Sequence, residues 1–163
     1  MAFSTYIQID GIEGQATDAA HANWIDVIAF KHGSAQQSAS HDQANSAGRG
    51  VLKPLVFTHA LDKATPNIQK ACMSGQNIAS VKMEVCAQIG GAKAKLYELE
   101  LTNARVIGAD VASADGKDGS VRVLEDVSLV AESVKWTAHT FKATGELAGD
   151  VAAGWNTTTD SAV

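Results

Sequence analysis

The fold class that this sequence predicts is mainly β: a small antiparallel β-barrel with one α-helix at its side. Three observations support it, namely strands with period-two hydrophobicity, short turn signals between them, and one segment with helical signals. The clearest alternation covers residues 81–89, where every odd position is apolar. A period of two is typical of a strand with one buried face. Residues 3–9 and 97–102 repeat the pattern.

Three further segments complete the predicted sheet. Residues 24–32 are apolar on both faces at their middle, which favours a central or covered strand. Within it Phe30 and Lys31 point to opposite faces, so we expect Phe30 in the barrel core and Lys31 outside. Residues 51–58 are rich in β-formers. Residues 121–136 are too long for one regular strand, and their shifting apolar phase predicts a bulge and a contribution to two strands.

The connections predict antiparallel neighbours. Gly90-Gly91 is typical of a tight hairpin, and residues 115–119 of a longer polar turn. One helix is expected over residues 64–75, with a cap, a first-turn residue and a terminator at Thr65, Pro66 and Gly75. Closing the sheet into a barrel would remove its exposed edges, and the helix would then cover an open end or seam.

Composition limits the function classes. The 163 residues suit one domain, 1–163, with a net charge of -5. Thirteen basic residues scattered among eighteen acidic ones argue against a nucleic-acid partner.

The longest apolar run, residues 27–30, is far shorter than the roughly 20 residues of a membrane-spanning helix, so no membrane insertion is expected. The first ten residues lack the features of a secretory signal, which predicts synthesis in the cytoplasm. Cys72 and Cys86 are interpreted as buried thiols.

No motif indicates catalysis, a metal site or a cofactor. The five histidines lack the spacing that places two imidazoles on one metal and are interpreted as scattered surface or capping residues. His41-Asp42 beside several serines raises the alternative of a hydrolase, but no G-x-S-x-G elbow is present. Gly48-Arg49-Gly50 precedes a predicted strand, so it favours a hinge over a phosphate loop. We therefore do not expect this protein to be an enzyme.

Residues 33–50 contain no large apolar side chain and predict an extended loop outside the core. A loop of this length is usually functional or disordered. We expect it to reach an adjacent subunit, with His41, Asp42, Asn45 and Arg49 as interface residues. Arg49 can present a forked cation to a neighbour's carboxylate. Trp155, in a small and polar C-terminal stretch, is a candidate docking anchor.

Several segments taken together resemble one family. They are Ile7-x-Ile9-x-Gly11-Ile12-x-Gly14, His21 followed by residues 25–30, Gly33 with its long Ser/Gly loop, Phe57-Thr58, residues 62–67 leading into Ala71-Cys72-x-Ser74-Gly75, and Gly154-Trp155-Asn156. This pattern, which covers nearly the whole chain, resembles the haemolysin-coregulated (Hcp) family of the bacterial type VI secretion system. Residues 34–47 and 109–120 depart from the family pattern.

The resemblance implies a barrel that assembles into a hexameric ring, with rings stacked into a tube around a wide lumen. It further implies a secreted carrier that holds effector proteins in the lumen, beneath a spike protein and inside a contractile sheath, without catalysis or a signal peptide. By the same resemblance Lys31 lies on the lumen wall and is repeated six times. The alternative for Lys31 is a solvated strand lysine, and the alternative function is a monomeric β-barrel that binds a small ligand.

Overall fold

The computed structural model describes residues 2–38 and 47–163. Within them the chain is mainly β with one helix, as expected. The strands are β1 (Phe3–Ile9), β2 (Ile25–Val27), β3 (Ala29–Lys31), β4 (Ser34–Ser38), β5 (Ala47–Leu52), β6 (Leu55–Ala60), β7 (Ile78–Ile89), β8 (Ala92–Asp115), β9 (Val121–Phe141), β10 (Leu147–Asn156) and β11 (Ser161–Ala162), and the helix is α1 (Thr65–Ser74).

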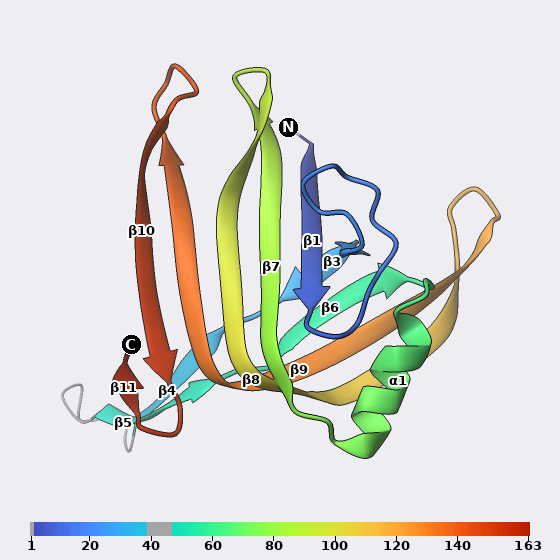
Figure 1. Ribbon diagram of the computed structural model, residues 1–163, viewed down its shortest axis with the longest axis horizontal. Coiled ribbons are helices and arrows are strands. Elements are labelled where there is room, and N and C mark those ends of the chain that lie inside the picture. Colours follow the sequence, from blue (N-terminus) through green and yellow to red (C-terminus); the bar gives the residue numbers. More distant parts are fainter. Residues whose placement is uncertain (1, 39–46) are drawn as a thin grey trace.

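The main sheet curls back on itself into a barrel-like shape (Figure 1). Its strand order is β11-β10-β9-β8-β7-β1-β2, and all the pairs are antiparallel. β3 follows β2 along the chain and pairs with β6, which pairs in turn with β9. At the junction of β2 and β3 the Ile28 backbone N–H donates to the Thr58 carbonyl over 2.8 Å. The ring of strands around the barrel therefore closes between β2 and β6, because the chain passes directly from β2 into β3, which pairs with β6.

Residues 24–32 form two short strands and not one central strand. The prediction that Phe30 lies in the core is wrong, because its side chain remains 39% exposed. Phe30 does face the core side, opposite the fully buried Phe57 in the pairing of β3 with β6. β3 is three residues long, and the chain leaves the barrel soon after it at Ser34, so burial of the ring is incomplete.

Residues 121–136 belong to the single long strand β9, so the predicted contribution to two strands is wrong. Different parts of this one strand pair with different neighbours. The first part of β9 pairs with β6, and its second part pairs with β10. Near the point where the partner of β9 changes from β6 to β10, the pairing of β9 with β8 shifts in register between Val106 and Gly108 of β8. A bulge on either strand of a pair bends both, because the extra residue increases the local twist.

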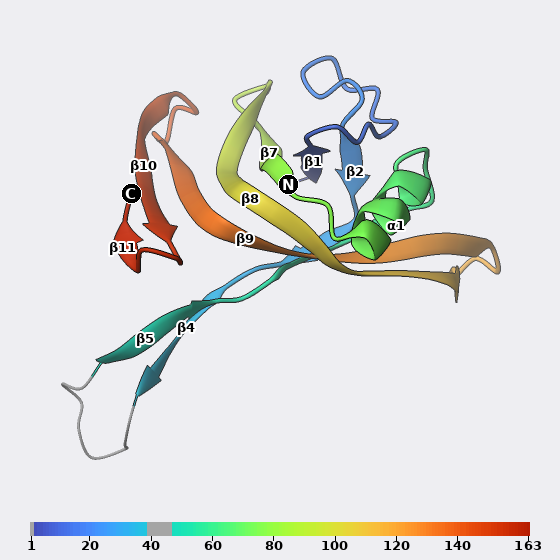
Figure 2. The same ribbon diagram turned by 60° about the horizontal axis from the view of Figure 1, so that its bottom comes forward.

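Helix α1 lies against β8 and buries Ile68 and Ala71 (Figure 2). The expected cap at Thr65 is wrong, since Thr65 is the first helical residue. The carboxylate of Asp62 instead accepts a hydrogen bond from the Ala64 backbone N–H over 2.9 Å. Gly75 ends the helix as predicted, in a left-handed conformation with φ 64°.

Side chains fill the interior of the barrel. The buried cluster draws on the core faces of the long strands, on β6 and on α1, and includes Ile7, Phe57, Ile68, Met83, Leu99 and Leu129. Cys86 is buried as predicted, whereas Cys72 is partly exposed. No helix of the described residues is long and apolar enough to cross a membrane.

Candidate assembly and cargo surfaces

Strands β4 and β5 form an arm that projects away from the barrel (Figure 2). The sequence predicted an extended loop here, but Ser34 pairs with Leu52 and Ala35 with Val51 in a two-stranded antiparallel sheet. The two strands satisfy each other's backbone groups. The described side chains of the arm are exposed up to Val51, and Leu52 at its base packs against the core.

Arg49 contacts its own chain at the base of the arm. Its guanidinium donates to the Thr157 carbonyl over 2.6 Å, and its Nε lies 4.0 Å from the Asp160 carboxylate. The side chain is 65% exposed, so it also remains accessible to another molecule. The other interface residues predicted from the sequence, His41, Asp42 and Asn45, lie outside the described residues.

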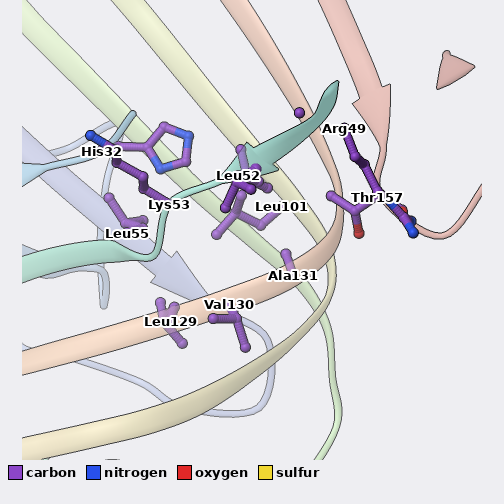
Figure 3. A pocket seen from close by; sticks show the side chains of 12 residues that line it. His32, Arg49, Leu52, Lys53, Leu55, Leu101, Leu129, Val130, Ala131 and Thr157 are labelled. Carbon is purple, nitrogen blue, oxygen red and sulfur yellow. The ribbon is translucent and has the colours of Figure 1, made fainter. Parts of the chain in front are cut away.

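A pocket of about 450 Å³ lies between the base of the arm and the barrel (Figure 3). Its apolar wall includes Leu101 and Leu129, and its polar groups come from His32, Arg49 and Lys53. Both ring nitrogens of His32 are buried without a hydrogen-bond partner in the described structure. Burial accordingly lowers the pKa of His32 below its usual value. The pocket thus combines an apolar wall with cationic groups.

Trp155 lines a second pocket, of about 440 Å³, on the other side of β5. Trp136 and the arm residues Val51 and Leu52 complete its apolar part. The indole of Trp155 therefore lies beneath the arm of its own chain. Its role as an anchor for another protein stays a prediction.

Lys31 is exposed on the outward face of the sheet formed by β3, β6, β9 and β8. It pairs with Val56, and the next row of this face contains Thr58, Asp126 and Asp110. The Thr58 hydroxyl donates to the Asp126 carboxylate. Asp126 and Asp110 lie directly opposite each other. The face that carries Lys31 therefore also carries two neighbouring carboxylates.

Comparison with known proteins decides the family. The sequence model of the family described as "Type VI secretion system effector, Hcp" matches residues 6–138. The chain belongs to the Hcp family. "Protein hcp1" of Pseudomonas aeruginosa is 32% identical over 158 residues, which are 96% of each chain.

Solved Hcp structures share the fold. A structure described as that of "a type six secretion system protein" has a TM-score of 0.91 and 28% identity, covering 99% of this chain and all of that one. Hcp1 from Salmonella typhimurium has a TM-score of 0.81 and 23% identity over the full length of both chains. The predicted family and the mainly β, barrel-like fold with its helix are confirmed. The chain is thus a type VI secretion tube protein by family.

Sequence reasoning missed a row of paired charges on the outward faces of β7 to β10 and on the loop between β1 and β2. We call it the outer ladder, and it consists of Asp18, His21, Lys82, Glu84, Lys93, Lys95, Glu98, His139 and Asp150. Lys82 lies 3.2 Å from Glu84 and 3.1 Å from Glu98. Burial raises the pKa of both carboxyls, but their hydrogen bonds to histidine and lysine outweigh it and hold each pKa below its usual value.

The interpretation of the histidines as scattered surface residues is wrong for His21 and His59, which are buried. Each pairs with a carboxylate more than 60 positions away in the sequence, His21 with Glu84 and His59 with Glu125. The spacing of residues within a short stretch of the sequence therefore does not indicate these two pairs. An acidic residue within a predicted strand was the available signal: Glu84 lies on the outward face of β7 and Glu125 lies in phase with the buried Val127 on β9. A buried histidine needs such a partner.

His139 predicts a pH-dependent contribution to stability. Burial opposes a charge on His139, but hydrogen bonds to Asp150 and Glu98 outweigh it and raise the pKa above 6.5. Because the folded-state pKa is raised, the stabilisation is complete below the unfolded value and is lost as pH rises through the folded value. His139→Gln should therefore cost about 0.5–1 kcal/mol at pH 5.5 and less at pH 9. Urea unfolding at both pH values measures this, and an equal loss at both would contradict it.

Proposed function

We propose that this chain forms closed hexameric rings that stack into the type VI secretion tube and hold effector proteins in their lumen. The near full-length match to an Hcp protein carries the proposal. The chain is then made in the cytoplasm, is secreted, and meets effectors, the spike protein and the contractile sheath. Its role is structural and not catalytic.

Two projections on opposite sides of the barrel support a ring. In Figure 2 the arm extends to the lower left, while the paired ends of β8 and β9 extend to the right. On that hairpin Val111, Val121 and Val123 are exposed on one face, which continues the face of the buried Glu125. Subunits that join through different patches on opposite sides form a ring when the rotation closes.

The two ends of the barrel differ in a way that suits stacking. The turns that join β7 to β8 and β9 to β10 lie at one end, and the arm and the C-terminal turn lie toward the other (Figure 1). Stacked rings would bring unlike ends together, which is the heterologous contact of an open tube. A stack of this kind can be extended ring by ring.

The packed interior argues against the alternative of a monomeric ligand-binding barrel. Large side chains such as Phe57 and Met83 are fully buried there. The arm-base pocket lies outside this core. We therefore do not adopt the ligand-binding alternative.

The outward face around Lys31 is the proposed cargo wall. A ring would present Lys31 six times, each near the carboxylates of Asp110 and Asp126. The wall then carries charges of both signs, and a positive lumen does not follow from Lys31 alone. Lys31 would serve as the contact for acidic groups of the cargo.

Lys31→Glu should leave the ring intact and weaken retention of a co-expressed effector roughly fivefold or more, the ratio that about 1 kcal/mol produces. The reason is that the variant replaces attraction to an acidic group by repulsion. Effector bound per ring after affinity purification is the measurement. Lys70→Glu is the matched control, because Lys70 is exposed on α1. Equal retention by both variants would remove Lys31 from the cargo contact.

A further inference from the structure

Three buried side chains of different chemistry converge where the loop after β1 meets β7. They are His21, Glu84 and Cys86, which are 3%, 4% and 1% exposed. One donor atom of each lies within 4.8 Å of the other two. Glu84 and Cys86 are two positions apart on β7, so both side chains point to the same face. His21 approaches them from the loop.

Each ring nitrogen of His21 contacts a carboxylate. Its Nδ1 lies 2.6 Å from the Asp18 carboxylate and its Nε2 lies 2.7 Å from the Glu84 carboxylate. A neutral imidazole has one N–H, whereas an ionised carboxylate only accepts hydrogen bonds. One of the two contacts therefore needs a second proton, on the imidazole or on a carboxylate, and this is the proton that a bound metal ion would replace.

The surroundings orient His21 as a metal ligand is oriented. Asp18 faces Nδ1, and this directs Nε2 toward Glu84 and Cys86; a carboxylate behind a ligating histidine is the usual arrangement. Lys93 holds Asp18 from the other side over 2.6 Å. The ring of Tyr6 stacks on the imidazole at 4.2 Å, and the indole of Trp24 meets its edge at 4.8 Å. The ring is therefore held on three sides.

The charges also suit a divalent ion. Glu84 and a Cys86 thiolate together supply two negative charges. Lys82 and Lys95 contact the other carboxylate oxygen of Glu84, Oε1, and leave Oε2 facing His21. Both lysines also contact Glu98, which offsets part of their charge.

We propose that His21 Nε2, Glu84 Oε2 and Cys86 Sγ bind one divalent transition metal of the zinc class per chain, with water as a fourth ligand. Nitrogen, oxygen and sulfur are the ligand types of zinc, at about 2.0–2.3 Å. A tetrahedral site at these bond lengths places donor atoms about 3.5 Å apart. From the arrangement seen here, His21 Nε2 and Glu84 Oε2, which are 2.7 Å apart, must therefore separate by roughly 1 Å, and Cys86 Sγ must move closer to them by up to roughly 1 Å. The ion takes the position of the second proton, and the protons of His21 Nε2 and of the Cys86 thiol pass to solvent.

Titration of the reduced protein with Co²⁺ tests the site, because a thiolate ligand gives cobalt an intense charge-transfer absorption. We expect the band to saturate at one Co²⁺ per chain and to disappear when Zn²⁺ is added. Cys86→Ser should abolish the band, and Cys72→Ser should retain it. Asp18→Asn should weaken cobalt binding about 10–100-fold, the usual effect of losing a partner behind a ligand.

Circular dichroism of each variant establishes that it is folded. If Cys86→Ser does not fold, Glu84→Gln replaces it, since the amide retains the shape of the side chain but is a poor metal ligand. A folded wild-type protein without a thiolate band would overturn the proposal. A band that survives in folded Cys86→Ser, or that disappears in Cys72→Ser, would do the same.

Discussion

Replacing residues 37–47 of the arm with a short glycine linker should abolish ring assembly and leave the barrel folded. Residues 37–47 contain no large apolar side chain, so their removal takes little apolar area from the core of the same chain. The arm projects from one side of the barrel, where it can contact a neighbouring subunit. Arg49 and the residues around the arm-base pocket remain in this variant.

Light scattering after size exclusion should give the mass of a single chain for the shortened protein. Its thermal unfolding should still show a cooperative transition, with a melting temperature near that of an isolated barrel. The control is a glycine-linker variant of residues 142–146, the turn that joins β9 to β10 and belongs to neither projection. It tests whether alteration of any surface turn has the same effect. An intact ring after arm shortening would show that the arm is not the interface.

Removing one partner of the buried pair His59–Glu125 should destabilise the chain by about 3–5 kcal/mol, because the other group is left buried without compensation. Both side chains are fully buried, and His59 Nε2 lies 2.7 Å from Glu125 Oε1. Gln69 of α1 donates to the second oxygen of Glu125 over 2.9 Å. The pair thus joins β6, β9 and α1.

His59→Leu should lower the melting temperature by roughly 6–20 °C, from about 2–4 °C per kcal/mol for a chain of this size. The double variant His59→Leu with Glu125→Leu should recover much of the loss, since replacing a whole buried ion pair with apolar groups is often neutral. Melting temperatures of the wild type, the single variants and the double variant together form a double-mutant cycle. A single variant as stable as the wild type, or a double variant with the summed loss, would contradict this account.

The elements that the sequence predicts well are those with local signals. The alternation over residues 81–89 lies within β7, Gly90-Gly91 is the turn to β8, and the helix begins and ends within a residue of the prediction. Each of these depends on neighbours in the sequence. Local chemistry was therefore sufficient to identify β7, the turn that follows it and the helix.

What the sequence did not predict depends on distant partners. The exposure of Phe30 follows from the shortness of β3 and the departure of the chain into the arm, which the apolar run does not indicate. The arm is a paired hairpin because its two polar strands satisfy each other. Glu125 and His59 appeared as ordinary polar positions of two strands, and only the pairing of β6 with β9 brings them together.

The mass of the purified protein in solution is the sharpest test of the proposed hexameric ring. We expect one species of six chains, that is six times 17.0 kDa, at micromolar concentration. Native mass spectrometry distinguishes this from other ring sizes. A stable species of 17.0 kDa at the same concentration would contradict the proposed ring, and with it the lumen and the cargo wall.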